Sequence, residues 1–379
     1  MVSSELRALR RAAADHTLFG PLDLEGALER LGFVQADPIR APARAQDLIL
    51  RHRVTGFRAG DLERAYADLP IVEDMIHVYG FLCRQHRRLL HPRRIARRFH
   101  VEEEHSHLRR VILAHLAAHG ASHPRAIEQA LEARHRRASI INAWGGQSSA
   151  TTRMLEVLHY RGLLQVVRRE QGIRIYALVT NDVDLKLTPQ QRADGLIDLL
   201  VRLYAPLPMA TVPQLTLMIN ERAIARDALR ARVPLLIRRG VLRTQRVDGI
   251  DYLWPAEPDG AVATQPNAAT SRVRFLAPFD PLVWDRRRFS LFWQWSYRFE
   301  AYVPAAKRRL GYYALPLLWE TEDDAQVVGW VNVARADGKR PAIAAGYVKK
   351  RPAGVPFRTA FDAEVARLET FLTRGASED

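Results

Sequence analysis

The sequence predicts an α+β protein in which tandem winged-helix units, each a helix-turn-helix followed by a β-hairpin, precede a C-terminal β-barrel-like domain. Three observations lead to this fold class. The chain has 379 residues, enough for more than one domain. A helix end, an Arg-Gly pair and two short strands around a Gly-containing turn occur at 158–179 and again at 236–254. After residue 272, apolar runs of strand length are separated by turns.

Two helices and a strand are expected at the N-terminus. The helices cover about 3–14 and 23–31, and Gly32 follows the second one as a helix-ending residue. Phe33 and Val34 then begin an apolar segment like the one that follows the later Arg-Gly pair. A first wing strand is therefore expected at this position.

A glutamine and an aspartate fall in this expected strand. Gln35 and Asp37 are two residues apart, so on a strand both side chains would point to one face, about 7 Å apart. An amide beside a carboxylate can orient and polarise one water molecule. The alternative is a strand end followed by an Asp-Pro turn. In a basic chain with helix-turn-helix units, the first interpretation predicts hydrolysis of a bond in DNA.

Three helices and a hairpin are expected in the second unit. The helices are predicted at 103–119, at 123–137 and after the Ser/Thr-rich segment 148–152. Gly162 and Gly240 end corresponding helices and lie 240 − 162 = 78 residues apart. That spacing fits one small unit of three helices and a hairpin, the order of a winged helix.

The rest of the chain completes the predicted organisation. Residues 190–254 repeat the order of helices and hairpin, and 255–272 are read as a linker. Strand-like runs follow, and an amphipathic helix is expected at 358–374, with Phe361 and Leu368 on its apolar face. The predicted domains are 1–100, 101–182, 183–256 and 257–379.

Basic residues outnumber acidic ones. Lys and Arg together number 57 and Asp and Glu together 42, which gives a formal net charge of +15. Such a charge predicts a polyanionic partner, either nucleic acid or an anionic membrane. An Arg-rich composition typical of a high-GC genome is the alternative explanation.

Several classes of protein are not expected. No apolar run approaches the roughly 18 residues of a membrane span, and the N-terminus lacks the apolar core of a signal peptide, so a cytoplasmic protein is predicted. The single cysteine, Cys83, leaves no internal disulfide, multi-cysteine zinc site or iron–sulfur cluster. His100 and His105 are wrongly spaced for two ligands on one helix face, and an HEXXH motif is absent, so no metal is expected.

Two segments are candidates for contacts with DNA phosphates. Residues 84–98 form a strongly basic stretch, for which a solvated helix face is the alternative. The hydroxyls of 148–152 suit contacts with the DNA backbone or, equally, the cap of the following helix. The candidate DNA-binding residues are Arg84, Arg87, Arg88, Arg93, Arg94, Arg97, Arg98, Ser148, Ser149, Thr151, Thr152 and Arg153.

Glu73 and His77 form a second candidate constellation. If this segment is a helix, their i,i+4 spacing puts both side chains on one face. They would then support the active site as a water relay or a contact to the lesion. The alternative is a structural Glu–His pair near a domain interface.

The chain resembles a known family at four motifs. These are VQADPI with the following RAPARAQDLILRHR, and FLAPFDPLVWDRRR with YRFEAYVPAAKRRLGYYALPLLW. They are similar to the winged-helix DNA glycosylases that unhook interstrand crosslinks, the AlkZ and YcaQ type, and the resemblance covers nearly the whole chain. One branch of that family carries Gln-x-Gln and the other Gln-x-Asp, so Gln35-Ala36-Asp37 looks like the YcaQ branch. The resemblance implies three tandem winged helices and a C-terminal β-barrel, which together form a C-shaped DNA-binding surface.

The resemblance also implies a chemistry. An N7-alkylated guanine is already cationic and leaves readily, so one carboxylate is enough where other glycoside hydrolases use two. Asp37 would act as general base and electrostatic stabiliser, and Gln35 would hold the water. No lysine nucleophile, metal or other cofactor is required, so the resemblance implies a monofunctional DNA glycosylase.

The expected partner is double-stranded DNA that carries alkylated purines or crosslinks. A monomer is expected, because the sequence has no clear dimerisation element. The main alternative is a non-catalytic winged-helix DNA-binding protein or transcription regulator, which would not need Gln-x-Asp. A membrane-surface protein is less well supported, because a basic amphipathic helix with an aromatic face is lacking.

Overall fold

The computed structural model describes residues 2–93, 95, 98–131, 139–141, 147–180, 187–219, 226–256, 271–334 and 340–373. The chain divides into two compact bodies. The larger body comprises Met1–Leu62, Asp194–Thr216 and Arg230–Asp379, and the smaller body comprises Glu63–Ala193 and Leu217–Leu229. Four helices begin in one body and end in the other: α4 (Asp61–Ala65), α11 (Pro189–Tyr204), α12 (Val212–Met218) and α13 (Arg226–Arg238).

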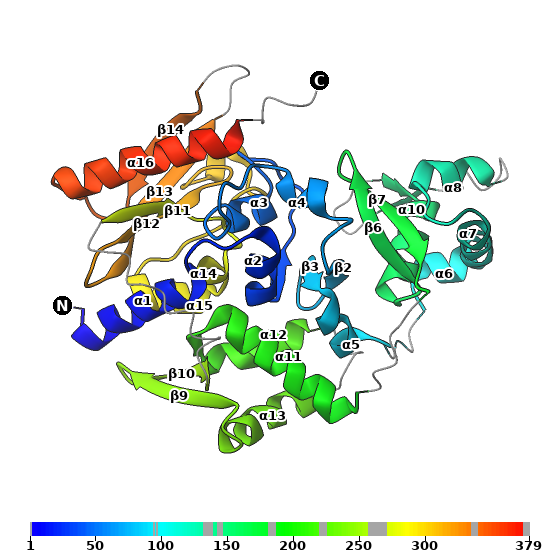
Figure 1. Ribbon diagram of the computed structural model, residues 1–379, viewed down its shortest axis with the longest axis horizontal. Coiled ribbons are helices and arrows are strands. Elements are labelled where there is room, and N and C mark those ends of the chain that lie inside the picture. The colour runs from blue at the N-terminus through cyan, green and yellow to red at the C-terminus, as the bar shows by residue number, and fades with distance from the viewer. Residues whose placement is uncertain are drawn as a thin grey trace. The chain divides into compact units, whose positions relative to one another are not determined.

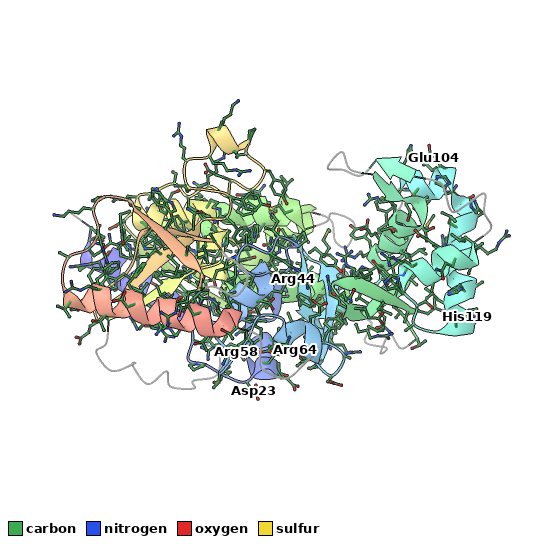
Figure 2. All side chains as sticks on the ribbon, turned by 90° about the horizontal axis from the view of Figure 1, so that it is seen from above. Asp23, Arg44, Arg58, Arg64, Glu104 and His119 are labelled. Carbon is green, nitrogen blue, oxygen red and sulfur yellow. The ribbon has the colours of Figure 1, made fainter. Side chains whose placement is uncertain are left out.

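The N-terminal segment of the larger body confirms the two expected helices. Helix α1 (Ser4–Thr17) begins at Ser3, whose hydroxyl accepts the Leu6 N–H. Helix α2 (Leu24–Leu31) begins at Asp23, labelled in Figure 2, whose carboxylate accepts the Gly26 N–H at 2.7 Å. Gly32 ends α2 with φ 67°, a conformation that favours glycine. Strand β1 (Phe33–Gln35) and helix α3 (Ala45–Leu50) follow.

The C-terminal part of the larger body is an open antiparallel sheet. Its order is β11-β12-β13-β14, with β11 Arg272–Phe275, β12 Leu315–Glu320, β13 Ala325–Ala334 and β14 Ala342–Tyr347. The expected barrel was wrong for the described residues, because β11 pairs only with β12 and β14 only with β13.

Helix α16 (Val355–Leu372) lies along this sheet (Figure 1). Its Phe357 packs against Trp319 of β12 and Tyr347 of β14, with ring centroids 5.4 and 6.3 Å away. The helix buries the apolar side chains of the sheet, so the sheet need not curl into a barrel to do so. The helix expected at 358–374 is confirmed as far as Leu372, and residue 374 lies outside the described residues.

A buried ion pair joins distant segments of the larger body. Helices α14 (Pro281–Trp284) and α15 (Arg286–Trp293) follow β11. Asp280 caps α14, and both of its carboxylate oxygens accept from the Arg53 guanidinium, at 2.8 and 3.0 Å. Both side chains are fully buried. Such a planar two-bond contact fixes the orientation of the segments after α3 and β11.

The second Arg-Gly repeat is also in the larger body. Gly240 follows α13 with φ 69°, and β9 (Leu242–Val247) pairs with β10 (Ile250–Pro255) as a hairpin. The short strand β8 (Leu207–Pro208) pairs with the other edge of β10. The predicted helix end and hairpin are therefore confirmed here. The predicted linker falls mainly on 257–270, which lie outside the described residues.

The smaller body contains the first Arg-Gly repeat. Helices α6 (His100–Glu104), α7 (Ser106–His119), α8 (Pro124–Ala130) and α10 (Ala150–Tyr160) precede the hairpin of β6 (Leu164–Glu170) and β7 (Ile173–Leu178). Glu104 and His119, at the ends of α6 and α7, are labelled in Figure 2. Gly162 has φ 80°, so the predicted helix end is confirmed. A short hairpin of β4 (Ser139–Ile141) and β5 (Gln147–Ser149) lies between α8 and α10.

Three sequence predictions for the smaller body need correction. The helix expected from 103 to 119 is interrupted at His105, the residue between α6 and α7. The helix expected at 123–137 ends at Ala130, and 132–138 lie outside the described residues. The helix expected around Glu73 and His77 is a hairpin of β2 (Ile71–Met75) and β3 (Tyr79–Cys83).

Short helices η1 (Arg84–His86) and α5 (Arg87–Leu90) follow β3 in the smaller body. In the larger body, η2 (Met209–Thr211) precedes α12 and η3 (Ala305–Lys307) precedes β12. No helix in the described ranges is long and apolar enough to span a membrane.

Candidate active site

Gln35 and Asp37 lie at the point where β1 becomes a loop. The strand ends at Gln35, and Asp37 is followed by Pro38, which cannot donate a backbone hydrogen bond. Asp37 Oδ1 accepts the Ile39 N–H at 2.9 Å, the bond of an aspartate turn. The prediction that one strand carries both side chains was therefore wrong at Asp37, and the Asp-Pro turn weighed as the alternative is present.

Helix α3 holds the backbone of this turn. The Asp37 N–H donates to Gln46 Oε1 at 3.3 Å, and Gln46 is buried on α3. Asp37 is itself half-buried, and burial raises the pKa of its carboxyl above the usual aspartate value. The hydrogen bond from Ile39 opposes part of this rise. A carboxylate that binds a proton more strongly than an exposed aspartate is the better general base at neutral pH.

Two tyrosines of the larger body respond to the charge of the same carboxylate. Its negative charge raises the pKa of Tyr302 and Tyr313, after the larger effect of burial. Phe299 contacts both tyrosines, with ring centroids 6.1 Å from Tyr302 and 5.3 Å from Tyr313. Tyr302 is 66% exposed and Tyr312 43% exposed, whereas Tyr313 is buried. Tyr302 therefore exposes its ring to solvent and responds to the Asp37 charge, whereas Tyr313 responds to that charge from a buried position.

The loop 300–313 that carries these tyrosines is held at several points. Glu300 Oε2 accepts the backbone N–H groups of Arg309 and Leu310, both at 2.8 Å, and of Gly311 at 3.3 Å. Asn332 of β13 donates to the Leu310 carbonyl at 2.7 Å. Gly311 has φ 120°, and a Cβ there would lie 2.2 Å from Asn332 Oδ1. The loop therefore presents its exposed rings from a fixed backbone.

Sequence reasoning did not single out this loop as a candidate site. It used the YRFEAYVPAAKRRLGYY segment only for the family resemblance. The signal that could have been used is the run Lys307-Arg308-Arg309 between tyrosines. The Arg308 guanidinium lies 5.0 Å from the Tyr312 ring centre. Alternating cations and aromatic rings suit contacts with nucleic acid.

Glu73 is engaged in a buried network of the smaller body. Its carboxylate accepts from Arg169 at 2.7 and 2.5 Å and from the Tyr79 hydroxyl at 2.7 Å, and Arg174 lies 3.5 Å away. Burial would raise the pKa of Glu73, but the hydrogen bonds and charge of Arg169 outweigh it and hold that pKa below its usual range. A carboxylate so occupied is a weak base.

His77 lies in the turn between β2 and β3. It is buried, and burial lowers the pKa of its imidazole to about 3. It therefore does not share a helix face with Glu73. A role of these two residues as a water relay or a lesion contact stays a prediction.

The basic stretch contains both buried and exposed arginines. Arg93 is buried: its guanidinium donates to Asp74 at 2.6 Å and to the Met75 carbonyl at 2.7 Å, and lies 4.3 Å from the Tyr160 ring centre. It is therefore not available to a phosphate in this conformation. Arg87 is half-buried and donates to the Gly162 carbonyl. Arg84, Arg88 and Arg98 are exposed, whereas Arg94 and Arg97 lie outside the described residues.

The hydroxyl-rich segment caps a helix. Ser149 Oγ accepts the Thr152 N–H at 3.1 Å and so caps α10, the alternative considered for this segment. Thr151 is buried, and Arg153 pairs with Glu156 at 2.5 Å. Ser148 belongs to β5, and its side chain lies outside the described part.

Metal ligands do not gather in the described part of the chain. Within it, no three His, Cys, Asp or Glu side chains are arranged to hold a metal ion. His100 instead lies 3.1 Å from Glu104 on the exposed face of α6.

Comparisons with known proteins agree with one another. Residues 28–371 match the family described as "DNA glycosylase AlkZ-like". Among solved structures, the chain is similar to the Streptomyces sahachiroi DNA glycosylase AlkZ, with a TM-score of 0.61 and 15% sequence identity. That match covers 99% of this chain and 98% of the other. At this identity the solved structure supports the fold, whereas the family match supports the class of activity.

Proposed function

The chain belongs to the AlkZ-like DNA glycosylase family, and on this premise we propose that it excises cationic N7-alkylguanine and unhooks DNA interstrand crosslinks. The family makes the protein an enzyme that acts on DNA. The observation that carries the finer proposal is Asp37, a half-buried carboxylate of raised pKa beside Gln35 and an exposed aromatic loop. A single base of this kind suits a lesion that is already a good leaving group.

The proposed reaction is a metal-free hydrolysis. Asp37 takes a proton from a water molecule as the water oxygen bonds to C1′ of the deoxyribose. The bond between C1′ and the base breaks, and its electron pair neutralises the cationic purine ring. Gln35 orients the water, and the carboxylate stabilises the positive charge that develops on the sugar. The products are the free base and an abasic site on an uncut strand.

DNA contacts are proposed separately for each body. In the larger body, Tyr302 and Tyr312 would stack on bases or sugars, and the exposed Lys307 and Arg309 would bind phosphates. In the smaller body, Arg84, Arg88 and Arg98 are the exposed members of the basic stretch. Arg93 is not included, because its guanidinium is buried against Asp74.

We also propose an organisation into modules, an oligomeric state and a location for the protein. The segments 1–100, 101–182, 183–256 and 257–379 are proposed as the modules of the chain, and the first three as winged helices. We propose a monomer that works in the cytoplasm, where the chromosome of a bacterial cell lies. Light scattering of the purified protein, alone and with a DNA duplex, tests the monomer.

The test of the proposed function uses three DNA duplexes of one sequence, which are undamaged, N7-methylated at one guanine, or crosslinked by a nitrogen mustard. Release of N7-alkylguanine and alkali-labile abasic sites are expected from both damaged duplexes, with no nick before alkali. EDTA should leave the rate unchanged, and borohydride should trap no covalent adduct. A protein that binds all three duplexes and releases nothing would instead be a DNA-binding regulator.

A further inference from the structure

Two buried polar atoms near Asp37 have no hydrogen-bond partner among the described residues. They are Oε1 of Gln35 and the hydroxyl oxygen of Tyr313. Gln35 is two residues from Asp37, and the Asp37 charge adds to the larger effect of burial in raising the pKa of Tyr313. Buried polar groups are nearly always paired, with the protein or with ordered water, so each such atom needs an explanation.

The ring of Tyr313 is fixed while its hydroxyl is not used by the fold. The residue is 3% exposed, and its ring meets Phe299 edge-on at 5.3 Å. Its neighbour in the core, Tyr297, shows the contrasting case, because that hydroxyl donates to the Ala314 carbonyl at 2.7 Å. The same core thus pairs one tyrosine hydroxyl with the backbone and leaves the other without a partner among the described residues.

We propose that Tyr313 positions the nucleophilic water together with Gln35 and Asp37, an inference that rests on the proposed function. The water gives one proton to the Asp37 carboxylate and directs the other at Gln35 Oε1. The Tyr313 hydroxyl donates to the water oxygen and occupies one of its two lone pairs. The remaining lone pair is then aimed at C1′.

The step balances in protons and electrons with water and the damaged DNA as the reactants. The water oxygen forms a bond to C1′, and the bond from C1′ to the base breaks with its electron pair moving onto the cationic ring. Asp37 accepts the water proton and later loses it to solvent. Tyr313 keeps its proton throughout, so it is a positioning residue and not an acid.

Tyr313→Phe is the primary test, because it removes the hydroxyl and keeps the ring beside Phe299. The single-turnover rate of N7-methylguanine release should fall about tenfold, as expected for one hydrogen bond made in the transition state. The Kd for the damaged duplex should stay the same, and the Tm should stay the same or rise, because a buried unpaired hydroxyl costs stability. Tyr347→Phe, whose ring packs on Phe357 of α16 in the same body, is the control variant and should keep the wild-type rate.

A double-mutant cycle tests whether one water is shared. Gln35→Ala and Tyr313→Phe should each slow the reaction, and the double variant should lose less than the product of the two losses. Independent, multiplicative losses would overturn the shared water. A Tyr313→Phe rate equal to wild type would overturn the role of Tyr313.

A crystal structure that resolves ordered waters separates failure of this inference from failure of the proposed function. Wild-type protein that releases no alkylated base contradicts the function. In that case the crystal structure still tests whether Tyr313 shares a water with Gln35 and Asp37. One water within about 3.2 Å of Gln35 Oε1, the Asp37 carboxylate and the Tyr313 hydroxyl supports it. The inference would be overturned if these three groups lie too far apart to share a water, or if the Tyr313 hydroxyl bonds to another group.

Discussion

At the residue scale, the environments of two acidic side chains favour Asp37 over Glu73 as the proposed base. Glu73 has both carboxylate oxygens bonded to Arg169, and its pKa lies below the usual range. Asp37 has one oxygen bonded to the Ile39 N–H, and burial raises its pKa. The sequence predicted Asp37 as the base and Glu73 only as possible support, but it did not predict the contacts that occupy Glu73. Arg169 lies 96 residues after Glu73, and no local pattern predicts that contact.

The raised pKa of Asp37 predicts how the rate depends on pH. The base must be ionised, so the single-turnover rate should fall as pH drops through a pKa above the ordinary aspartate value of 3.8. The rate of N7-methylguanine release, corrected for spontaneous loss, should therefore decline before pH 3.8 is reached. A rate that stays constant down to 3.8 would mean that Asp37 is not the base.

Glu73 gives a second prediction at this scale. Glu73→Gln should lower the free energy of unfolding by about 3 kcal/mol, because it leaves Arg169 with a buried and unbalanced charge. The excision rate per folded molecule should stay close to wild type. Glu170→Gln is the control, since its pair with Arg168 is about half-exposed and should contribute less than about 1 kcal/mol. A large loss of rate without loss of stability would return Glu73 to the active site.

At the element scale, glycines made the repeats predictable. Gly162 and Gly240 both have positive φ and both stand between a helix and a hairpin, as the Arg-Gly pattern predicted. The hairpin of β2 and β3 was missed, because the apolar segment 71–83 also fits a helix. Its strand pairing, with Glu73 opposite Phe81, depends on the tertiary contacts of the smaller body.

The end of β1 is a second place where the sequence alone did not predict the local structure. The sequence placed Gln35 correctly in a strand, but the strand stops there and does not reach Asp37. Pro38 and the bond from Ile39 to Asp37 favour a turn over a continued ladder. The turn was weighed as an alternative to catalysis, yet it is the turn that presents the carboxylate of Asp37.

At the scale of the whole molecule, the compact bodies do not follow the order of the sequence. The larger body combines three separate stretches of sequence, and the pair of Arg53 and Asp280 joins residues 227 positions apart. Composition and turn signals predicted the order of elements but not this combination. The predicted barrel failed for a related reason, because α16 covers the four-stranded sheet instead of further strands.

The net charge of +15 predicts salt-dependent DNA binding. Replacing Arg84, Arg88 and Arg98 with Ala should weaken binding to damaged and undamaged duplexes alike. The slope of log affinity against log salt should flatten by about 0.9 for each lost phosphate contact. Replacing the exposed Arg239, Arg246 and Arg340 removes the same charge and should change the slope less. Equal slopes in the two triple variants would remove the basic stretch from the DNA surface.

The most direct test of the central claim compares wild type with Asp37→Asn on a duplex that carries one N7-methylguanine. The substitution keeps the shape of the side chain and removes the base. Wild type should release the methylated guanine, and Asp37→Asn should be about 100-fold slower in single turnover, with the same Kd and Tm. Wild-type rates in Asp37→Asn, at unchanged affinity and folding, would contradict the account and place the catalytic group elsewhere.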